Sequence, residues 1–143
     1  MEIFLKGESG TRLPKRSLIR TAQKVLQKLG YKDVELSITF VRDPAIKKLN
    51  RDYRGKNSAT DVLSFSAAPD FPSVTSYIGD VVISVDTAKR NALSDGRSLK
   101  DEITTLIVHG ILHLAGYDHE RGSKKEAERM MRKQKAILKE VLS

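Results

Sequence analysis

The chain has 143 residues with 39% apolar side chains, enough to bury one core, and we expect a single domain over residues 1–143. It contains no cysteine, so disulfide frameworks and thiolate metal sites are excluded and a reducing compartment such as the cytoplasm is expected. The formal net charge is +8 and no apolar run is long enough to cross a membrane, so we expect a soluble protein without a membrane partner.

The chain is predicted to begin with a short strand over residues 3–5. A helix then opens at Pro14 and closes at Gly30, because proline suits the first helical position and glycine suits the residue after the last turn. Its apolar stripe consists of Leu18, Ala22, Val25, Leu26 and Leu29. Alternation of apolar and polar residues over 34–40 predicts a strand with one buried face.

A second helix is predicted to start at Asp43, as the capping residue, with Pro44 at the first helical position and Gly55 just beyond the end. Its inward side is predicted to hold Ile46, Leu49 and Tyr53. Two strands follow, over residues 62–65 and 78–85, and the loop between them holds Pro69 and Pro72.

Three helices complete the chain. Asp86 is predicted to cap the first of them, whose apolar residues are Ala88, Ala92 and Leu93, and Ser98 with Asp101 forms the start of the second. The last helix covers residues 123–141, with an apolar side made of Ala127, Met130, Met131, Ile137, Leu138 and Val141. This order predicts an α+β fold: a small mixed four-stranded sheet covered by about five helices, with the histidine-bearing helix buried centrally.

All three histidines fall in one eleven-residue window, 109–119. His109 and His113 are four residues apart, so their imidazoles share one face of a helix and can grip one ion. Gly116 can adopt the left-handed conformation that ends the helix, and the turn can then bring His119 back toward the pair. Three imidazoles and one open position are the coordination of a catalytic zinc, so the window predicts one Zn²⁺ or another divalent metal.

The alternative for each histidine taken alone is a hydrogen-bonded core residue without a metal. The helix that carries the pair is apolar on nearly every side, and a polar ring in such surroundings costs free energy unless it is paired. One shared ion satisfies both rings, so we favour the metal site.

Charge is unevenly distributed along the chain. Residues 1–60 hold 14 Lys and Arg against 6 Asp and Glu, residues 61–119 hold 4 against 8, and residues 120–143 hold 8 against 4. If the two basic segments flank the metal site, they form a rim that attracts RNA or DNA. The alternative is that helices such as 123–141 only present their lysines to water.

Two enzyme classes fit three histidines at this spacing. The pattern H-x-x-x-H-x-x-G-x-x-H matches that of metzincin zinc peptidases, whose general base is a glutamate directly after the first histidine. Gly110 stands at that position, so a peptidase is disfavoured.

Phosphodiester hydrolysis instead needs a Lewis acid and a fixed cation, because charge builds on the phosphate oxygens. Arg54 is the candidate cation, since a guanidinium grips a phosphate with two parallel hydrogen bonds. The alternative is an arginine that only interacts with the dipole of the helix it ends.

Three segments resemble the YbeY family of bacterial metal-dependent endoribonucleases, which function in ribosomal RNA maturation. They are H-G-I-L-H-L-A-G-Y-D-H over 109–119, L-N-R-D-Y-R-G-K-N-S-A-T-D-V-L-S-F over 49–65 and I-G-D-V-V-I-S over 78–84. The chain departs from the family where members usually have proline in place of Ala59, often an acidic residue in place of Asn57, and commonly proline in place of Ser66.

The resemblance implies that His109, His113 and His119 bind the metal, usually zinc, and that Arg54 is the functional arginine beside it. It also implies a small sheet backed by helices, a metal at one end of a groove, and association with the small ribosomal subunit. The expected activity is single-strand-specific cleavage of RNA in ribosomal RNA maturation and ribosome quality control, with Arg51 and Lys56 on neighbouring phosphates. The non-enzymatic alternative is a ribosome-assembly factor with a structural metal.

Three further residues near these motifs keep two interpretations each. Asp118 either orients a ligand imidazole or fills a turn, and we favour the turn. Thr60 and Asp61 either face the metal groove or form a turn before the strand. No general base is predicted from the sequence.

Overall fold

The computed structural model of the chain describes residues 1–7, 12–67, 76–117 and 123–142, and this part holds four strands and five helices. In chain order they are β1 (Glu2–Lys6), α1 (Lys15–Lys28), β2 (Glu35–Val41), α2 (Asp43–Arg54), β3 (Val62–Ser66), β4 (Tyr77–Ser84), α3 (Val85–Asp95), α4 (Leu99–Leu114) and α5 (Lys124–Val141). The predicted α+β class is confirmed. The predicted loop with Pro69 and Pro72 lies outside the described residues, as do Asp118 and His119.

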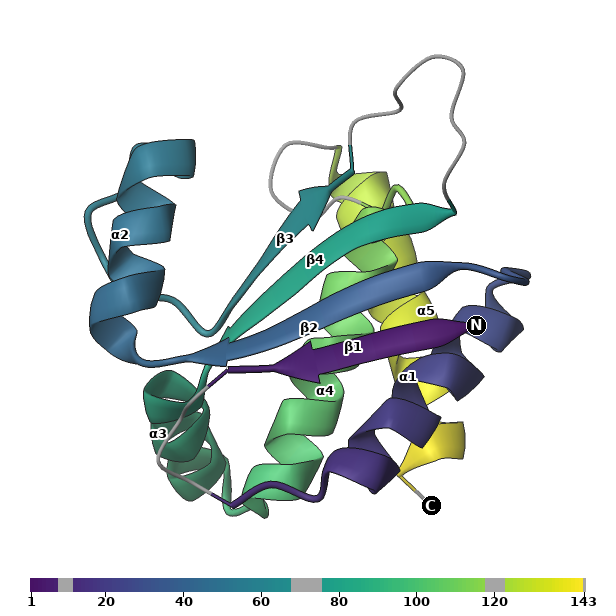
Figure 1. Cartoon of the computed structure of the whole chain (residues 1–143), viewed down its shortest axis with the longest axis horizontal. Helices are drawn as coiled ribbons and strands as arrows, with labels where there is room; N and C mark the ends of the chain where they lie inside the picture. Colours follow the sequence, from purple (N-terminus) through teal and green to yellow (C-terminus); the bar gives the residue numbers. More distant parts are fainter. Residues whose placement is uncertain (8–11, 68–75, 118–122, 143) are drawn as a thin grey trace.

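The sheet has the strand order β1-β2-β4-β3 (Figure 1). β1, β2 and β4 are parallel to one another, and β3 pairs with β4 in the antiparallel direction, so the sheet is mixed as predicted. The chain passes from β2 through α2 to β3 at the outer edge and then returns to β4 beside β2. This arrangement leaves β3 as an edge strand of the described sheet, and the cleft discussed below lies along it.

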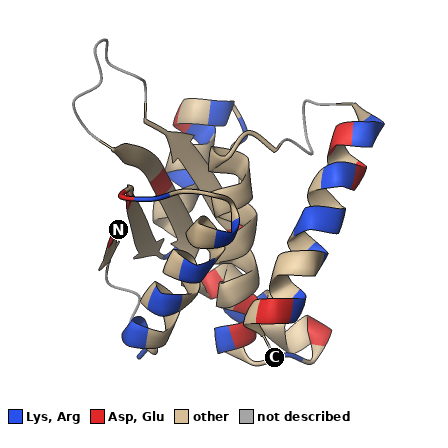
Figure 2. Cartoon of the chain, turned by 90° about the vertical axis from the view of Figure 1, so that its right-hand side faces the viewer, with Lys and Arg blue, Asp and Glu red and all other residues tan. Residues whose placement is uncertain are grey.

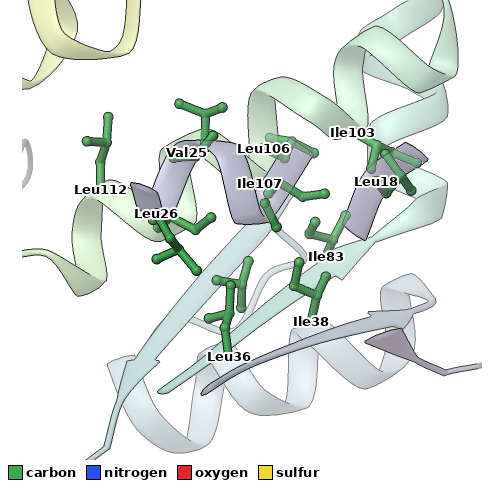
Figure 3. Close-up of a cluster of buried hydrophobic side chains, with 14 of the residues drawn as sticks. Leu18, Val25, Leu26, Leu36, Ile38, Ile83, Ile103, Leu106, Ile107 and Leu112 are labelled. Carbon is green, nitrogen blue, oxygen red and sulfur yellow. The ribbon is translucent and has the colours of Figure 1, made fainter. Parts of the chain in front are cut away.

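One face of the sheet is covered by α1 and α4, which enclose the main core (Figure 3). Ile38 and Ile83 project from the sheet and meet Leu18 of α1 and Ile103 and Ile107 of α4, all of which are fully buried. α5 packs on the outer side of α1 and α4, away from the sheet (Figure 2). α4 is thus sandwiched between the sheet and α5, which confirms the predicted central position of the histidine helix.

The opposite face carries a smaller cluster in which Ile46 of α2 packs on Leu63 and Val82. The predicted inward position of Tyr53 is wrong, because this side chain is 69% exposed. The first turns of α2 cover the sheet, whereas its last turn lies beside the edge strand, and Tyr53 touches only the rim of the cluster through Phe65.

Two other apolar residues that the sequence analysis places on the apolar sides of their helices are exposed. Leu93 is 86% exposed and Met131 is 50% exposed. α3 buries Val85, Ala88 and Ala92, and α5 buries Met130 and Ile137. The buried face of each helix is therefore narrower than the distribution of its apolar residues suggests. In the described part of the chain, no helix combines the length and the apolarity that a membrane crossing requires.

The start of α2 is tied to α3 by hydrogen bonds to Asp43 rather than by capping. Its carboxylate accepts from Ser84 Oγ at 2.6 Å, Thr87 Oγ1 at 2.7 Å and Arg90 Nη2 at 2.8 Å. Burial raises the pKa of Asp43, but these hydrogen bonds lower it more, so the pKa lies below its usual value. The predicted cap is therefore wrong, because the carboxylate reaches across to the next elements instead of its own helix.

The predicted cap of α4 is confirmed, whereas the predicted cap of α3 is not. Ser84 caps α3 by accepting from the Thr87 N–H, and Asp86 instead accepts from the Arg42 side chain, so the predicted Asp86 cap is wrong. Ser98 caps α4 and accepts from the Asp101 N–H at 3.1 Å, as predicted.

Candidate active site

A cleft of about 570 Å³ lies along the outer edge of β3, where the C-terminal ends of α2 and α4 come together. The two helices pack on opposite faces of the sheet, and both reach this side because β3 is an edge strand. The cleft is lined by Tyr53, Arg54, Thr60, Asp61, Val62, Leu63, Ser64, Phe65, Ser66, His109, His113, Gly116 and Tyr117.

The predicted imidazole pair is present on the cleft side of α4. His109 and His113 are half-buried, and their ring centroids lie 4.8 Å apart with an interplanar angle of 63°. The helix ends as predicted, because Gly116 has a φ of 97° and the Tyr117 N–H donates to the Leu112 carbonyl. The third predicted ligand, His119, lies outside the described residues.

His109 is oriented by a residue that the sequence analysis did not single out. Gln134 of α5 approaches His109, with its Oε1 2.8 Å from Nδ1. Because an amide oxygen only accepts, Nδ1 is the donor, and in the neutral ring the lone pair is then on Nε2. Metals bind the form of imidazole in which one nitrogen donates a hydrogen bond and the other has a free lone pair for the ion.

Gly110 lies on the side of α4 that faces the sheet. Its carbonyl accepts from Ser64 Oγ at 2.9 Å, and a Cβ at this position would lie 2.6 Å from Val81 Cγ1. Val81 is fully buried, so a side chain at position 110 would force it to shift. A glutamate after the first histidine, which the peptidase class requires, has no room in this fold.

We predict that Gly110→Ala lowers the free energy of unfolding by about 1–3 kcal/mol. The new methyl group overlaps Val81, whose β-branched side chain is stiff, and this cost exceeds the gain of about 1 kcal/mol in helix propensity. Urea unfolding measures the change. The control is the double variant Gly110→Ala/Val81→Ala. Its loss of unfolding free energy should be smaller than the summed losses of the two single variants. Strict additivity would show that the two positions do not clash.

On the other side of the cleft, Arg54 is the last residue of α2, half-buried and part of the lining. Thr60 and Asp61 also line the cleft, and the chain bends at Asp61 directly before β3, so the structure agrees with both of their interpretations. Asn91 Nδ2 donates to the Asp61 carboxylate at 3.3 Å, which fixes the acidic group of this wall. Arg51 and Lys56 are exposed and are not part of the lining, and their role on neighbouring phosphates stays a prediction.

Basic residues of both terminal segments reach this region. Figure 2 shows Lys and Arg along α5, and one of them, Arg129, stacks over the ring of Tyr117 with 5.0 Å to the centroid. Tyr117 lines the cleft, while Arg54 lines it from α2. The sequence-based expectation of a basic rim is supported at these two places, although most basic residues of α5 face solvent.

The donor set fits a divalent metal with imidazole ligands. Two half-buried imidazoles share one helix face at an open cleft, and one of them is held by an amide acceptor. Within the described ranges, His, Asp and Glu form no group of three or more that would complete a metal site. A third ligand would come from His119, outside those ranges.

An open cleft that brings imidazoles and a guanidinium together suits a reaction in which negative charge builds on phosphate oxygens. The same helix has no room for the base of a zinc peptidase. Within this α+β fold, the cleft therefore has the groups expected of a hydrolase that acts on phosphodiester bonds.

Comparison with known proteins agrees with this class. The family model described as Endoribonuclease YbeY matches residues 5–142. The chain is 43% identical over 143 residues to Endoribonuclease YbeY of Persephonella marina, covering 99% of this chain and 93% of the relative. It is 47% identical over 112 residues to that of Aquifex aeolicus, covering 78% and 74%. This chain belongs to the YbeY family of endoribonucleases, which confirms the resemblance drawn from the motifs.

A solved structure supports the fold as well. The solution structure of TM1509 from Thermotoga maritima matches with a TM-score of 0.66 and 29% sequence identity, covering 97% of this chain and 88% of that one. The match covers nearly the whole of this chain and therefore supports the fold as a whole.

Proposed function

We propose that this endoribonuclease depends on a divalent metal, cleaves single-stranded RNA, and acts in ribosomal RNA maturation and ribosome quality control at the small ribosomal subunit. The observation that carries the proposal is that His109, His113 and Arg54 line one cleft although they come from helices on opposite faces of the sheet. The cytoplasmic location expected from the sequence stays a prediction.

The ion, zinc in the first instance, would be held by His109, His113 and His119 and would supply Lewis-acid polarisation of a phosphate oxygen. Gln134 keeps the Nδ1 proton of His109 in place, so that Nε2 of the neutral ring can act as a ligand. The neighbours of His109 on α4, Val108 and Gly110, are buried, so the helix turns this imidazole toward the cleft.

Arg54 contributes a permanent positive charge and parallel N–H donors at the end of α2. Because it is half-buried at the cleft, its charge is screened less than that of an arginine in water. We assign it the stabilisation of charge on the non-bridging oxygens of the scissile phosphate. The cleft of about 570 Å³ is of the size of pockets that hold small ligands, so it can take a part of an RNA strand such as one nucleotide.

The proposal is tested with purified protein and a labelled RNA, used single-stranded and annealed to its complement, with and without a chelator. We expect internal cuts in the single strand only, loss of cutting with the chelator, and recovery when zinc is returned. A zinc-loaded protein that binds the small subunit but never cuts RNA would instead support the assembly-factor alternative. Metal-dependent cutting of unstructured peptides would support the peptidase alternative.

We predict that Gln134→Leu weakens zinc binding by about 10- to 100-fold. The change removes the acceptor of the His109 Nδ1 proton and therefore the preference for the ligand form of the ring. Titration of metal-free protein with zinc against a competing chelator measures the affinity, independently of activity. Gln134→Glu keeps an acceptor and should retain the affinity, and Lys135→Ala is the control for an exposed change on the same helix. Equal zinc affinity in Gln134→Leu and the wild type would contradict this role.

A further inference from the structure

Tyr53 is an exposed aromatic side chain at the end of α2, beside the edge strand of the sheet. It is one of five large apolar side chains that are exposed in the described residues, together with Phe4, Leu93, Met131 and Leu142. Among these five, Tyr53 is the one that lines the cleft. It directly precedes Arg54 in the chain, so an exposed aromatic ring and the proposed phosphate-binding guanidinium lie next to each other at the end of α2.

The ring of Tyr53 is oriented but not covered. It meets Phe65 of β3 edge to face, with the ring centroids 5.2 Å apart and an interplanar angle of 68°. This contact restricts the ring while 69% of the residue stays accessible. The other tyrosine of the cleft, Tyr117, differs because Arg129 stacks on its ring and its body packs on the main core. Tyr53 is thus the most exposed aromatic ring among the described residues that line the cleft.

The strand beside Tyr53 also directs main-chain groups toward this side. The Ala67 N–H donates to the Ile78 carbonyl, and the Ser84 N–H donates to the Asp61 carbonyl, so odd-numbered residues of β3 bond to β4. In an antiparallel pair the alternate residues point their N–H and C=O groups the other way. The main-chain groups of Ser64 and Ser66, on either side of Phe65, are therefore directed away from β4, toward the outer edge where the cleft lies.

We propose that Tyr53 forms a nucleobase subsite, in which one unpaired base of the RNA stacks on its exposed ring while an adjoining phosphate lies at Arg54. The inference rests on the proposed function, because it takes single-stranded RNA as the substrate. Aromatic rings stack on every base but need an unpaired one, so the subsite favours a single strand without reading its sequence. The main-chain N–H and C=O groups of Ser64 and Ser66 can then bond to the polar edge of the base that stacks on Tyr53.

The first test compares binding of two probes by the zinc-loaded protein: a short 2′-O-methyl oligoadenylate and a strand of equal length without bases. Tyr53→Ala should weaken oligoadenylate binding by about 5- to 100-fold and leave binding of the abasic strand unchanged. Tyr53→Phe keeps the ring and should restore the affinity. Phe4→Ala, which removes a 45% exposed ring on the opposite edge strand, should change neither. A gel checks that the probe stays intact.

The second test uses the absence of tryptophan from the chain. Tyr53→Trp introduces a single indole, whose fluorescence should be quenched by oligoadenylate and not by the abasic strand. Phe4→Trp is the matched control and should respond to neither probe. Quenching of both variants alike, or of neither, would overturn the stacking assignment.

The outcomes separate this inference from the proposed function. If the wild type binds oligoadenylate and Tyr53→Ala binds it equally well, the nucleobase subsite is wrong and the proposed substrate stands. If the wild type binds neither probe, single-stranded RNA is the wrong substrate and both proposals fall. A loss of binding to both probes in Tyr53→Ala would assign the residue to the shape of the cleft instead of to base stacking.

Discussion

His113→Ala is expected to reduce cleavage of single-stranded RNA by about 1000-fold or more and to leave the purified protein without zinc. Lewis-acid catalysis contributes several kcal/mol to stabilising a phosphoryl transition state, and each 1.36 kcal/mol corresponds to a factor of ten in rate. His113 and His109 present their rings 4.8 Å apart on one helix face, so removing one imidazole leaves a single described ligand. Elemental analysis and single-turnover cleavage of a labelled RNA measure the two effects.

The controls for this variant separate loss of the ion from loss of the fold. His113 lies at the cleft and not in the main core, so the variant should unfold at the same temperature as chelated wild type. Lys100→Ala, an exposed change at the other end of α4, should keep both zinc and activity. If His113→Ala retains stoichiometric zinc and cuts RNA at the wild-type rate, the imidazole pair is not the metal site.

The histidine pair was predictable because its geometry is local. A spacing of four residues places two side chains on one helix face in any fold, and the helix boundaries were marked by Ser98 and Gly116. Arg54 was a candidate by its chemistry and by the family motif, and its place at the end of α2 follows from Gly55, which has a φ of 71° at the C-cap. The sequence therefore specified each helix end that borders the cleft.

The strand order could not be predicted because it depends on pairing between distant segments. No local pattern states that β3 takes the outer edge while β4 inserts beside β2, yet this choice places α2 and α4 along the same strand. The exposure of Tyr53 has the same origin, since an apolar residue at helical spacing is buried only if the sheet extends beneath it. Apolar spacing alone could not show where the sheet ends.

Gln134 could have been found from a weaker signal. It lies four residues after Met130 and three before Ile137, so it is a polar residue within the buried stripe of α5. Such a residue needs a hydrogen-bond partner when α5 packs on α4. The identity of that partner, His109, comes only from the packing of the two helices.

Arg54→Ala is expected to lower the cleavage rate by about 100- to 1000-fold while zinc content and unfolding temperature stay at wild-type values. Removing one preorganised donor from developing negative charge costs about 3–4 kcal/mol in comparable sites. Arg54→Lys keeps the charge but loses the paired donors, so its cleavage rate should lie between those of the wild type and Arg54→Ala. Lys48→Ala, an exposed change six residues earlier on α2, is the matched control for loss of a positive charge.

The kinetic signature of Arg54→Ala also distinguishes its role from that of Tyr53. A group that acts on charge in the transition state changes kcat, whereas a stacking surface that holds substrate and transition state alike changes KM. Arg54→Ala should therefore lower kcat, and Tyr53→Ala should mainly raise KM, although the two residues are adjacent on α2. Binding of oligoadenylate at increasing salt adds a second measure, because each lost phosphate contact reduces the slope by about 0.7. An Arg54→Ala protein with unchanged kcat and only a smaller salt slope would make Arg54 a phosphate-binding residue without a part in the chemistry.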